Sequence, residues 1–430
     1  MSIDLKNIKK VHCVGIGGIG VSAVARLFAD RGASVSGSDM SDSPVTEGLR
    51  AAGIAVHIGH DASHVAADTD LVIHTIAVPG DNPELIAARQ AGIAVRSYPE
   101  VLGLLSENFY TVAVSGTHGK TTTTAMLARV LSAADRDPTV IVGSLLHDEE
   151  SNFIAGSSDL LVVEACEYRR SFLHLHPDLL IITNVDTDHL DYFEDLSDIQ
   201  DAFSELAGNV ADDGVVVCDP EAENLAPVIN NCGADLIDFA DIDLEGELEV
   251  PGEHNRQNGQ AATAAASYLG VDVAAATASI RSFAGTWRRA QKKGELDSGA
   301  LVFDDYGHHP TEISSTLAGF RSRWPDRKLI VAFQPHLYSR TKQLLAEFSK
   351  SFTDADRVLI LPIYAAREAP DPDISAELLV EKLIEQGTAA ELVADFSVAE
   401  KRLRELADDE TLILTQGAGD IYQVADNLTL

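Results

Sequence analysis

Cysteine is scarce in this chain of 430 residues, which contains only four. They are spaced neither as the paired ligands of a zinc site nor as densely as in a disulfide-stapled domain. The four are Cys13, Cys166, Cys218 and Cys232. This pattern excludes a disulfide scaffold and favours a reducing compartment, so we expect a cytoplasmic protein.

Basic residues are also few, because 32 Lys and Arg stand against 67 Asp and Glu and the formal net charge is −35 at pH 7. Nucleic-acid binding depends on Lys and Arg contacts to phosphates, so this balance excludes nonspecific binding to DNA or RNA. Acidic residues recur along the whole chain, and we interpret them as a solvated, mutually repulsive surface. Anionic substrates would therefore need basic groups gathered locally in a cleft.

Long apolar runs are absent, and residues 1–10 lack the apolar centre of a secretion signal. We therefore expect no membrane partner. The length predicts two or three domains, and the 45% hydrophobic content is that of a globular protein. The sequence does not decide between a monomer and a homodimer.

What the sequence does contain is an alternation of short apolar strands and amphipathic helices, which predicts an α/β fold built on parallel sheets. Three domains are expected, over residues 1–107, 108–287 and 288–430. Strands are predicted at 11–15, 33–38, 70–75 and 94–96 in the first, at 110–114, 160–163, 179–183 and 214–218 in the second, and at 301–304, 328–333, 357–361 and 411–415 in the third. A helix is predicted at 397–408, where Ser397 and Glu400 have the spacing of a capping box.

The strongest functional signal is residues 115–122, Ser-Gly-Thr-His-Gly-Lys-Thr-Thr, directly after the strand 110–114. Glycines between a strand and a helix let backbone N–H groups approach phosphate oxygens, and the helix N-terminus adds partial positive charge. Lys120 is placed to reach the outer phosphates, and Thr121 to bind Mg²⁺. The segment predicts ATP binding, although Val114 stands where the general motif has glycine; a turn that only caps a helix is the structural alternative.

A second glycine-rich turn lies near the start, at residues 15–20, Gly-Ile-Gly-Gly-Ile-Gly. A strand precedes it and a helix follows, and Asp39 ends the next strand, where a ribose-binding acid would lie. Taken alone, this pattern suggests an NAD-dependent dehydrogenase. The residues themselves indicate only a helix N-terminus that can bind a diphosphate, whichever nucleotide contains that diphosphate. A turn with a purely structural role is the alternative.

Acidic residues follow two of the central strands. Glu164 ends the first, near the phosphate loop, where a second Mg²⁺ ligand is expected, and Glu167 is a further candidate or an acid near a helix start. The second strand leads into residues 183–191, Thr-Asn-Val-Asp-Thr-Asp-His-Leu-Asp. Three acids and a His at a strand's carboxyl end predict a metal site, in which Mg²⁺ would prefer the oxygens to the imidazole of His189.

Polar segments also follow predicted strands or begin predicted helices farther along the chain, at 252–258, 304–312, 333–341 and 364–368. The first would contact an adenine edge or simply cap its helix. The second carries paired histidines, without the further ligands of a standard zinc site. The last two contain basic side chains at the edge of an open sheet where ligands usually bind. These side chains could bind a carboxylate; the alternative is that they are ordinary surface arginines.

These segments together resemble the Mur ligase family. Nine occur in order: GIGGIGVSAVA, SGTHGKTTTT, TNVDTDHLDYF, GEHNRQN, WRR, DDYGHHPTEI, FQPHLYSRT, YAAREAP and TQGAGDI. The resemblance covers essentially the whole chain. It implies an N-terminal Rossmann-like domain that binds a UDP-substrate, a central P-loop ATPase-type domain with a parallel sheet, and a C-terminal Rossmann-like domain that binds an amino acid. In this family the first glycine-rich turn holds the UDP diphosphate rather than NAD.

Within the family, the segments DDYGHHPTEI and FQPHLYSRT best resemble members that join L-alanine to the lactyl carboxylate of UDP-N-acetylmuramate. The resemblance implies an ATP-dependent ligase of peptidoglycan synthesis, working through an acyl phosphate with Mg²⁺. It implies catalytic roles for Lys120, Glu164 and His189, and metal binding by Thr121, Glu164 and His189. The implied ATP-binding residues are Gly116, Thr117, His118, Gly119, Lys120, Thr121, Thr122, His254, Asn258, Arg289 and Asp305. Those implied for the UDP-substrate side are Gly15, Gly17, Gly18, Ile19, Gly20, Asp39, His308, His336 and Arg340.

One loop departs from the family pattern. An acidic residue often stands two positions after the magnesium glutamate, whereas Cys166 stands there in this chain and two arginines, Arg169 and Arg170, follow. These arginines are candidates for binding a substrate phosphate or carboxylate. Remaining alternatives are a family member that adds a peptide or another amino acid, an NAD-dependent oxidoreductase, and a nucleotide-binding regulator without turnover.

Overall fold

The computed structural model describes residues 5–146, 151–190, 192–230, 232–366 and 368–430. It contains three sheets, mostly parallel, and the chain divides into two compact units. The first unit holds residues 1–187, 195–243 and 259–280, and the second holds 188–194, 244–258 and 281–430. Asp191 and Arg367, which belong to two of the predicted functional segments, lie outside the described residues.

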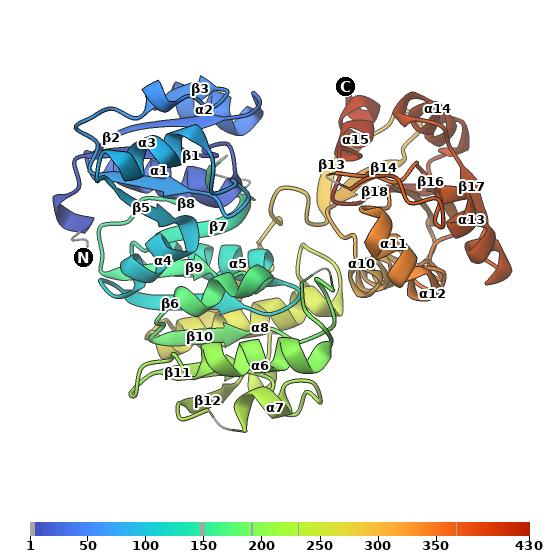
Figure 1. The fold of residues 1–430 in the computed structure, drawn as a ribbon. Helices are drawn as coiled ribbons and strands as arrows, with labels where there is room; N and C mark the ends of the chain where they lie inside the picture. Colours follow the sequence, from blue (N-terminus) through green and yellow to red (C-terminus); the bar gives the residue numbers. More distant parts are fainter. Residues whose placement is uncertain (1–4, 147–150, 191, 231, 367) are drawn as a thin grey trace. The chain divides into compact units, whose positions relative to one another are not determined.

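The first unit begins with a five-stranded parallel sheet of order β3-β2-β1-β4-β5 (Figure 1). Its strands are β1 (Lys10–Val14), β2 (Ser34–Asp39), β3 (Ala55–Ile58), β4 (Leu71–His74) and β5 (Ala94–Ser97). Its helices are α1 (Ile19–Asp30), α2 (Pro44–Ala51), α3 (Pro83–Gln90) and α4 (Tyr98–Ser106), with a 3₁₀ turn at Ala62–His64. The sequence predictions missed β3, an edge strand with no fully buried residue, because it lacks the apolar run that marked the others.

The same unit contains a seven-stranded sheet of order β12-β11-β10-β6-β9-β7-β8, in which only β8 runs antiparallel to its neighbour. Its strands are β6 (Tyr110–Ser115), β7 (Thr139–Leu146), β8 (Ser151–Ile154), β9 (Leu160–Glu164), β10 (Leu179–Ile182), β11 (Val215–Cys218) and β12 (Asp235–Asp238). The main helices are α5 (Lys120–Ala133), α6 (Leu196–Ala207), α7 (Ala226–Ile229), α9 (Val273–Arg281) and α8 (Glu253–Tyr268), whose residues up to Asn258 belong to the second unit. Every residue of β10 and β11 is buried, as expected of parallel strands covered on both faces.

The two sheets of the first unit are joined by more than the chain connection. Asn152 on β8 is buried, and its amide group donates to the hydroxyl of Ser22 on α1 at 2.8 Å and to the carbonyl of Ile19. The first turn of α1 is thereby tied to the central sheet.

The second unit is built on a six-stranded sheet of order β13-β14-β18-β15-β16-β17, with β13 antiparallel to β14. Its strands are β13 (Gln291–Glu295), β14 (Leu301–Asp305), β15 (Lys328–Phe333), β16 (Arg357–Ile360), β17 (Ala390–Leu392) and β18 (Thr411–Gln416). Its helices are α10 (Pro310–Arg323), α11 (Tyr338–Gln343), α12 (Leu345–Phe348), α13 (Ala376–Glu385), α14 (Phe396–Leu406) and α15 (Tyr422–Thr429). Val302 and Phe303 belong to separate core clusters, because successive residues of a strand point to opposite faces.

One predicted detail of this unit is wrong. Helix α14 begins at Phe396 and its N-cap is Asp395, whose carboxylate accepts the N–H of Val398 at 2.9 Å and the hydroxyl of Ser397 at 2.7 Å. Ser397 therefore does not form a capping box with Glu400, because the acid two positions earlier already supplies the acceptor.

Candidate functional site

The phosphate loop lies between β6, which ends at Ser115, and α5, which begins at Lys120. Gly119 caps the helix with a φ of 85°, and Gly116 has a φ of 133°. A side chain at Gly116 would place its Cβ 2.0 Å from the hydroxyl oxygen of Thr183, so only glycine fits there. The loop has the strand–glycine turn–helix geometry that the sequence predicted.

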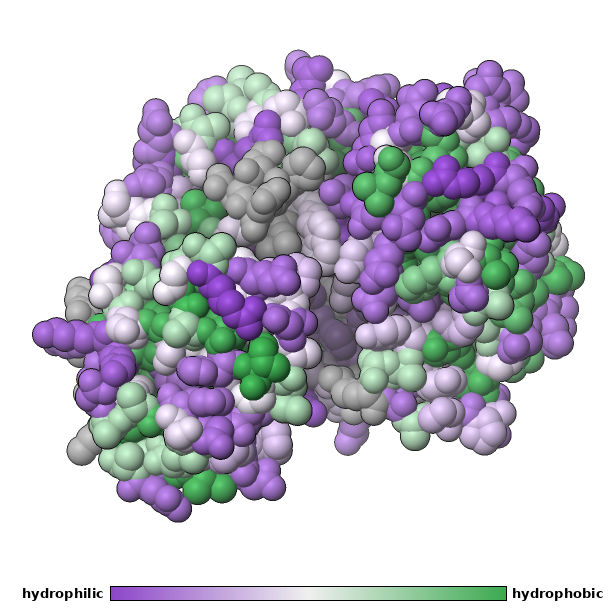
Figure 2. All heavy atoms as spheres, turned by 90° about the horizontal axis from the view of Figure 1, so that it is seen from above, coloured by the Kyte–Doolittle hydropathy of each residue, from purple (hydrophilic) through white to green (hydrophobic). Residues whose placement is uncertain are grey.

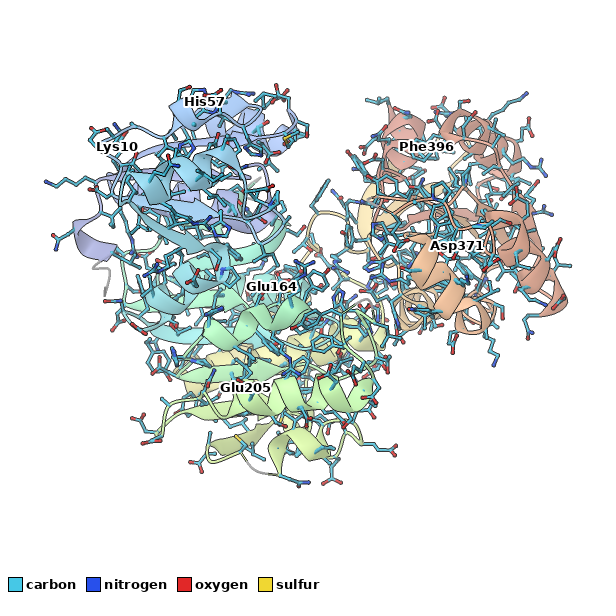
Figure 3. All side chains as sticks on the ribbon, viewed as in Figure 1. Lys10, His57, Glu164, Glu205, Asp371 and Phe396 are labelled. Atoms are coloured by element: carbon cyan, nitrogen blue, oxygen red, sulfur yellow. The ribbon has the colours of Figure 1, made fainter. Side chains whose placement is uncertain are left out.

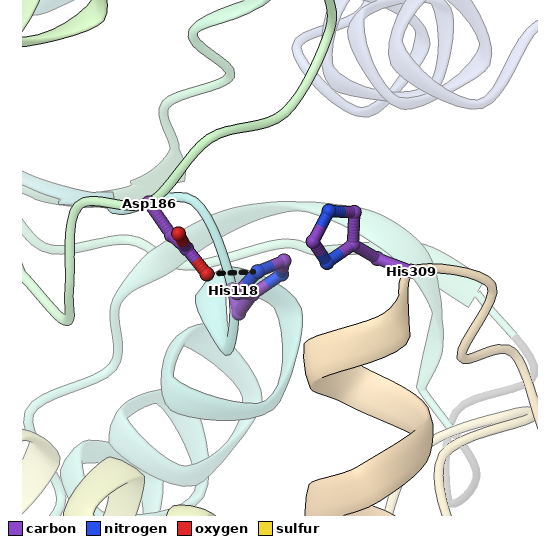
Figure 4. Close-up of side chains that lie close together, drawn as sticks. All are labelled: His118, Asp186 and His309. Atoms are coloured by element: carbon purple, nitrogen blue, oxygen red, sulfur yellow. Dashed lines mark ion pairs between the residues drawn. The ribbon is translucent and has the colours of Figure 1, made fainter. Parts of the chain in front are cut away.

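The segment after β10 holds this loop in place. Thr183 and Asn184 donate side-chain hydrogen bonds to the carbonyl of His118, at 2.5 and 3.0 Å, and the Asn184 side-chain oxygen accepts the His118 N–H at 2.9 Å. The Thr117 hydroxyl accepts the N–H of Asp186 at 2.9 Å, and Figure 4 shows the Asp186 carboxylate aligned with the imidazole of His118, with 3.6 Å between the atoms that pair. Sequence reasoning predicted a metal site in this segment and did not predict its support of the loop.

Lys120 has its ammonium group directed back onto the phosphate loop. Its Nζ donates to the carbonyls of Gly116 and Thr117 at 2.6 and 2.9 Å and pairs with the buried carboxylate of Glu167 at 2.8 Å. Burial alone lowers the pKa of Lys120, but the charge of Glu167 outweighs this effect and the pKa lies above its ordinary value. The lysine is therefore a permanent cation in the loop.

Glu164, labelled in Figure 3, ends β9, and its carboxylate contacts Thr121 at the start of α5. One carboxylate oxygen accepts the Thr121 hydroxyl at 2.9 Å, and the other accepts the N–H of Gly143 at 2.6 Å. Hydroxyl and carboxylate oxygens are the donors that Mg²⁺ prefers. The two residues predicted as metal ligands in this unit are thus adjacent and of suitable chemistry.

The divergent loop after Glu164 has its own supports. Arg169 and Arg170 have positive φ values of 53° and 55°. Arg170 forms an ion pair of 2.5 Å with Asp198 on α6, and Arg169 is exposed beside the ring of Tyr168. Arg170 is thus engaged with its own domain, and any contact of Arg169 with substrate stays a prediction.

The N-terminal turn is held by the end of β2. The carbonyl of Ser38 accepts the N–H groups of Gly15 and Ile16 at 2.8 and 3.0 Å, and the carboxylate of Asp39 accepts the N–H of Gly17 at 2.8 Å. A Cβ at Gly17 would lie 2.8 Å from that carboxylate oxygen. The turn leads into the N-terminus of α1, a location suited to a diphosphate.

In the second unit, three of the predicted residues come together. A ring nitrogen of His336 lies 3.1 Å from the guanidinium of Arg340, and the rings of His308 and His336 have centroids 5.9 Å apart. Arg340 also pairs with Asp188 at 3.6 Å, and Asp188 is the residue before the predicted metal ligand His189. The arrangement concentrates cationic and imidazole groups beside β14 and β15.

These groups are buried enough to alter their protonation. Burial, together with the charge of Arg340, lowers the pKa of His308 to about 3 despite the opposing carboxylate of Glu312. Burial raises the pKa of Asp188, but the charges of His189 and Arg340 outweigh it, and the pKa lies below the usual range. At neutral pH His308 is therefore an uncharged imidazole and Asp188 an anion.

The remaining predicted residues of this unit are tied to its framework. The buried carboxylate of Asp305 accepts the N–H groups of Ala290 and Gly307 at 2.9 and 2.8 Å. Arg289 lies over the ring of Tyr306, with its guanidinium carbon 5.1 Å from the ring centre. His254 and Asn258 lie in the first turns of α8. The nucleotide contacts of all four predicted residues stay predictions.

Sequence reasoning missed Arg288, which is 2% exposed. Its guanidinium pairs with Asp304 at 2.8 Å and donates to the carbonyls of Gly419, at 2.8 Å, and Gly417, at 2.5 Å. It ties the segment that carries Arg289 to β14 and to the turn after β18. In the sequence Arg288 stands close to Arg289, Lys292 and Lys293, and nothing in this basic segment indicated that one of its side chains would be buried.

The face in Figure 2 is covered mostly by hydrophilic residues, with smaller hydrophobic areas between them. This agrees with the large excess of acidic side chains in the sequence. Among the residues that the structure describes, no helix is both long and apolar enough to cross a membrane.

Three family models match successive parts of the chain. They are the Mur ligase family, catalytic domain, at residues 10–110; the Mur ligase middle domain, at 114–241; and the Mur ligase, glutamate ligase domain, at 288–419. Each contains one of the three sheets or most of it. The exact boundaries at 107 and 287 stay predictions.

Two curated relatives match over almost their whole length. The UDP-N-acetylmuramate–L-alanine ligase of Clostridium acetobutylicum is 36% identical, with 99% of each chain covered. The enzyme of the same name from Caldicellulosiruptor bescii is 40% identical, with 97% of this chain and 98% of its own covered.

Solved structures give the same result for the fold. The UDP-N-acetylmuramate-alanine ligase MurC of Thermotoga maritima has a TM-score of 0.80 and 30% identity, with 97% of this chain and 98% of its own covered. A murein peptide ligase of Psychrobacter arcticus, at 24% identity, shares the fold with a TM-score of 0.69. The predicted three-domain α/β architecture and the predicted resemblance are both confirmed: the chain belongs to the Mur ligase family.

Proposed function

We propose that this chain joins L-alanine to the carboxylate of UDP-N-acetylmuramate, with ATP converted to ADP and phosphate, as a step in making peptidoglycan precursors. The observation that carries this function is the end-to-end similarity to ligases of that name, combined with a phosphate loop that keeps its lysine, threonine and acidic partner. The chain needs no nucleic acid or membrane for this reaction. We place it in the cytoplasm, as a monomer or homodimer.

In the first step, an oxygen of the substrate carboxylate attacks the γ-phosphorus of ATP, the bond to ADP breaks, and an acyl phosphate forms. Two anions must approach each other, so positioning and cations supply most of the catalysis. Lys120 would hold the transferring phosphate, whose oxygens would compete with Glu167 for the ammonium group. The N–H groups of the loop from Gly116 to Gly119 would hold the other phosphates.

Thr121 and Glu164 would hold one Mg²⁺, and their adjacent hard oxygen atoms fit that ion. Bound there, the ion supplies charge neutralisation at the phosphates. His189 would belong to a second metal position, as the family resemblance implies.

In the second step, the neutral amine of alanine attacks the acyl carbon, phosphate leaves, and the amine loses a proton as the amide forms. The alanine carboxylate needs a cation, and Arg340 beside His336 offers one in an otherwise acidic protein. His308 is uncharged at neutral pH and adds no further charge to this group.

The UDP part of the substrate would lie at the N-terminal turn. The start of α1 and the turn from Gly15 to Gly20 offer backbone N–H groups to the diphosphate, and Asp39 would contact the ribose. No lysine or arginine lies in the turn itself, so it would bind the diphosphate through backbone groups and the helix dipole.

Phosphate release tests the proposal. We expect release only when UDP-N-acetylmuramate, ATP and L-alanine are all present, with a UDP-linked alanine amide as the product. A tripeptide such as L-alanyl-γ-D-glutamyl-meso-diaminopimelate should not replace L-alanine. Release with the tripeptide and none with L-alanine would overturn the assignment in favour of a peptide ligase.

A further inference from the structure

A buried glutamate surrounded by histidines lies beneath the N-terminal turn, and the proposed reaction does not use it. Glu84 is in the first turn of α3 and is fully buried. Among the residues that the structure describes, it has three ion-pair partners, and all are histidines: His12, His60 and His64. A carboxylate so deeply buried must be matched by hydrogen bonds, and here imidazoles, a hydroxyl and a backbone N–H surround it.

The partners of Glu84 come from three parts of the N-terminal domain: β1, β2 and the segment after β3. One carboxylate oxygen accepts the hydroxyl of Ser38 on β2 at 2.5 Å and lies 3.4 Å from Nε2 of His12 on β1. The other lies 2.8 Å from Nδ1 of His64 in the 3₁₀ turn and accepts the N–H of Asp61 at 3.2 Å. The carboxylate therefore joins the middle of β1, the end of β2 and the segment after β3 to α3.

His57 extends the cluster to the surface. It is exposed at the end of the N-terminal domain shown in Figure 3, on β3, and its ring stacks on that of His64 with centroids 4.2 Å apart. The imidazoles of His12, His60 and His64 converge on the carboxylate of Glu84.

Ser38 connects this cluster to the turn. Its hydroxyl is bound to Glu84 and lies 2.9 Å from Nδ1 of His60, while its carbonyl accepts the N–H groups of Gly15 and Ile16. The next residue, Asp39, accepts the N–H of Gly17. The end of β2 thus makes three hydrogen bonds to the glycine-rich turn and is itself held by Glu84.

We propose that Glu84 is a positioning residue for UDP-substrate binding, which acts through Ser38 to hold the N-terminal turn in its diphosphate-binding conformation. Glu84 does not touch the substrate. The inference rests on the proposed function, because it takes the turn to be the UDP-binding site. Under this proposal, the turn at residues 15–20 is kept rigid by the buried carboxylate of Glu84, more than 60 residues farther along the sequence.

The test compares Glu84→Gln with Glu100→Gln. Gln keeps the shape of the side chain and removes its charge. Glu100 is a matched control in the same domain, because its carboxylate accepts the N–H and hydroxyl of Ser97 at the start of its own helix, at 2.7 and 2.8 Å. Affinity for UDP-N-acetylmuramate is measured by calorimetry without ATP, and kcat and the KM for ATP by phosphate release.

We expect Glu84→Gln to bind the UDP-substrate about tenfold more weakly, as the loss of one charged hydrogen-bond network predicts. The KM for ATP and kcat at saturating substrate should stay within twofold of wild type, and Glu100→Gln should match wild type throughout. A general loss of structure would instead lower the active fraction, and with it kcat, for all substrates together. That pattern would overturn the inference.

Ser38→Ala keeps the inference testable if Glu84→Gln does not fold. It removes only the hydroxyl that joins the carboxylate to the turn-supporting strand, and it should also weaken UDP-substrate binding selectively. Unchanged affinity in folded Ser38→Ala would overturn the inference while leaving the proposed function intact. Failure of the wild-type chain to bind the UDP-substrate would instead overturn the proposed function and, with it, this inference.

Discussion

The two glycine-rich turns of the first unit have the same location in their folds and different chemistry. Each lies between the carboxyl end of a parallel strand and a helix N-terminus. The turn at 15–20 contains no charged side chain, whereas the loop at 115–122 contains Lys120 and is followed across the sheet by Glu164. In the proposed reaction the first would bind a diphosphate that does not react, and the second a phosphate that does.

Their supports differ in the same way. The first turn is held by the end of β2, through Ser38 and Asp39, which are held in turn by the buried Glu84. The phosphate loop is held by the side chains of Thr183 and Asn184 and by the pairing of Asp186 with His118, and Lys120 of the loop pairs with Glu167. Lys120, which we propose to hold the transferring phosphate, is thus paired within its own loop, whereas the first turn is held through a buried network that the proposed ligand would not touch.

The largest expected effect comes from the phosphate loop. Lys120→Ala should lower kcat by roughly 10³-fold, since it removes the cation at the transferring phosphate. Affinity for UDP-N-acetylmuramate, measured by calorimetry, should stay close to wild type. Lys328→Ala is the control, because that lysine is an exposed partner of Asp408 on the other unit. Equal losses in kcat and in affinity for UDP-N-acetylmuramate would show that the two turns do not have separate roles in catalysis and substrate binding.

The acidic partner of the loop gives the next effect. Glu164→Gln should lower activity roughly 10²-fold at limiting Mg²⁺, because it removes a hard anionic ligand. Raising the Mg²⁺ concentration should restore part of the activity, and a Mg²⁺ titration of phosphate release measures this. Glu205→Gln on α6 is an exposed glutamate of the same unit and should behave as wild type. The same Mg²⁺ dependence in Glu164→Gln and wild type would contradict the metal role.

A change in the first turn should affect binding rather than chemistry. In Gly17→Ala the new Cβ would lie 2.8 Å from the Asp39 carboxylate, so the turn must shift. We expect the KM for UDP-N-acetylmuramate to rise roughly tenfold with kcat changed little, as loss of uniform binding predicts. Gly80→Ala, whose Cβ would meet no atom within 4 Å, is the control. A fall in kcat at saturating substrate would place this turn in the chemical step.

The smallest effect is a pH dependence of stability in the second unit. The folded-state pKa of His308 is about 3, against an ordinary value of 6.5, so the unfolded chain binds a proton that the folded chain rejects between those values. The contribution of His308 to stability is therefore complete above pH 6.5 and declines as the pH falls toward 3. His308→Gln should flatten this part of the melting-temperature profile, and an unchanged slope would contradict the burial of a neutral imidazole.

Much of the fold and of the phosphate site could be predicted from the sequence. The phosphate loop, Glu164 at its strand end and most strands were predicted because each depends on local pattern: apolar runs, glycines at turns and a lysine–threonine pair at a helix start. The family resemblance added the roles of segments that local chemistry left open.

The contacts that could not be predicted depend on which strands pair. Asn184 holds the phosphate loop only because β10 lies beside β6, and the sequence pattern of Thr183 to Asp191 suggested metal ligands instead. The cluster around Glu84 joins residues 12, 38, 60 and 64, whose proximity follows from the order of the first sheet. Helix α14 was misassigned at its start because two acceptors, Asp395 and Ser397, compete for one capping position.

In the proposed reaction, the phosphate loop activates the carboxylate of a UDP-sugar as an acyl phosphate. L-alanine then forms the amide with the activated carboxylate. Mass spectrometry of the products tests it most directly, using UDP-N-acetylmuramate with both carboxylate oxygens labelled by ¹⁸O. An oxygen that attacks the γ-phosphorus stays with the phosphate when the amine displaces it. We expect one ¹⁸O in the released phosphate and one in the new amide. Phosphate without ¹⁸O, or label in phosphate without an alanine amide, would contradict it.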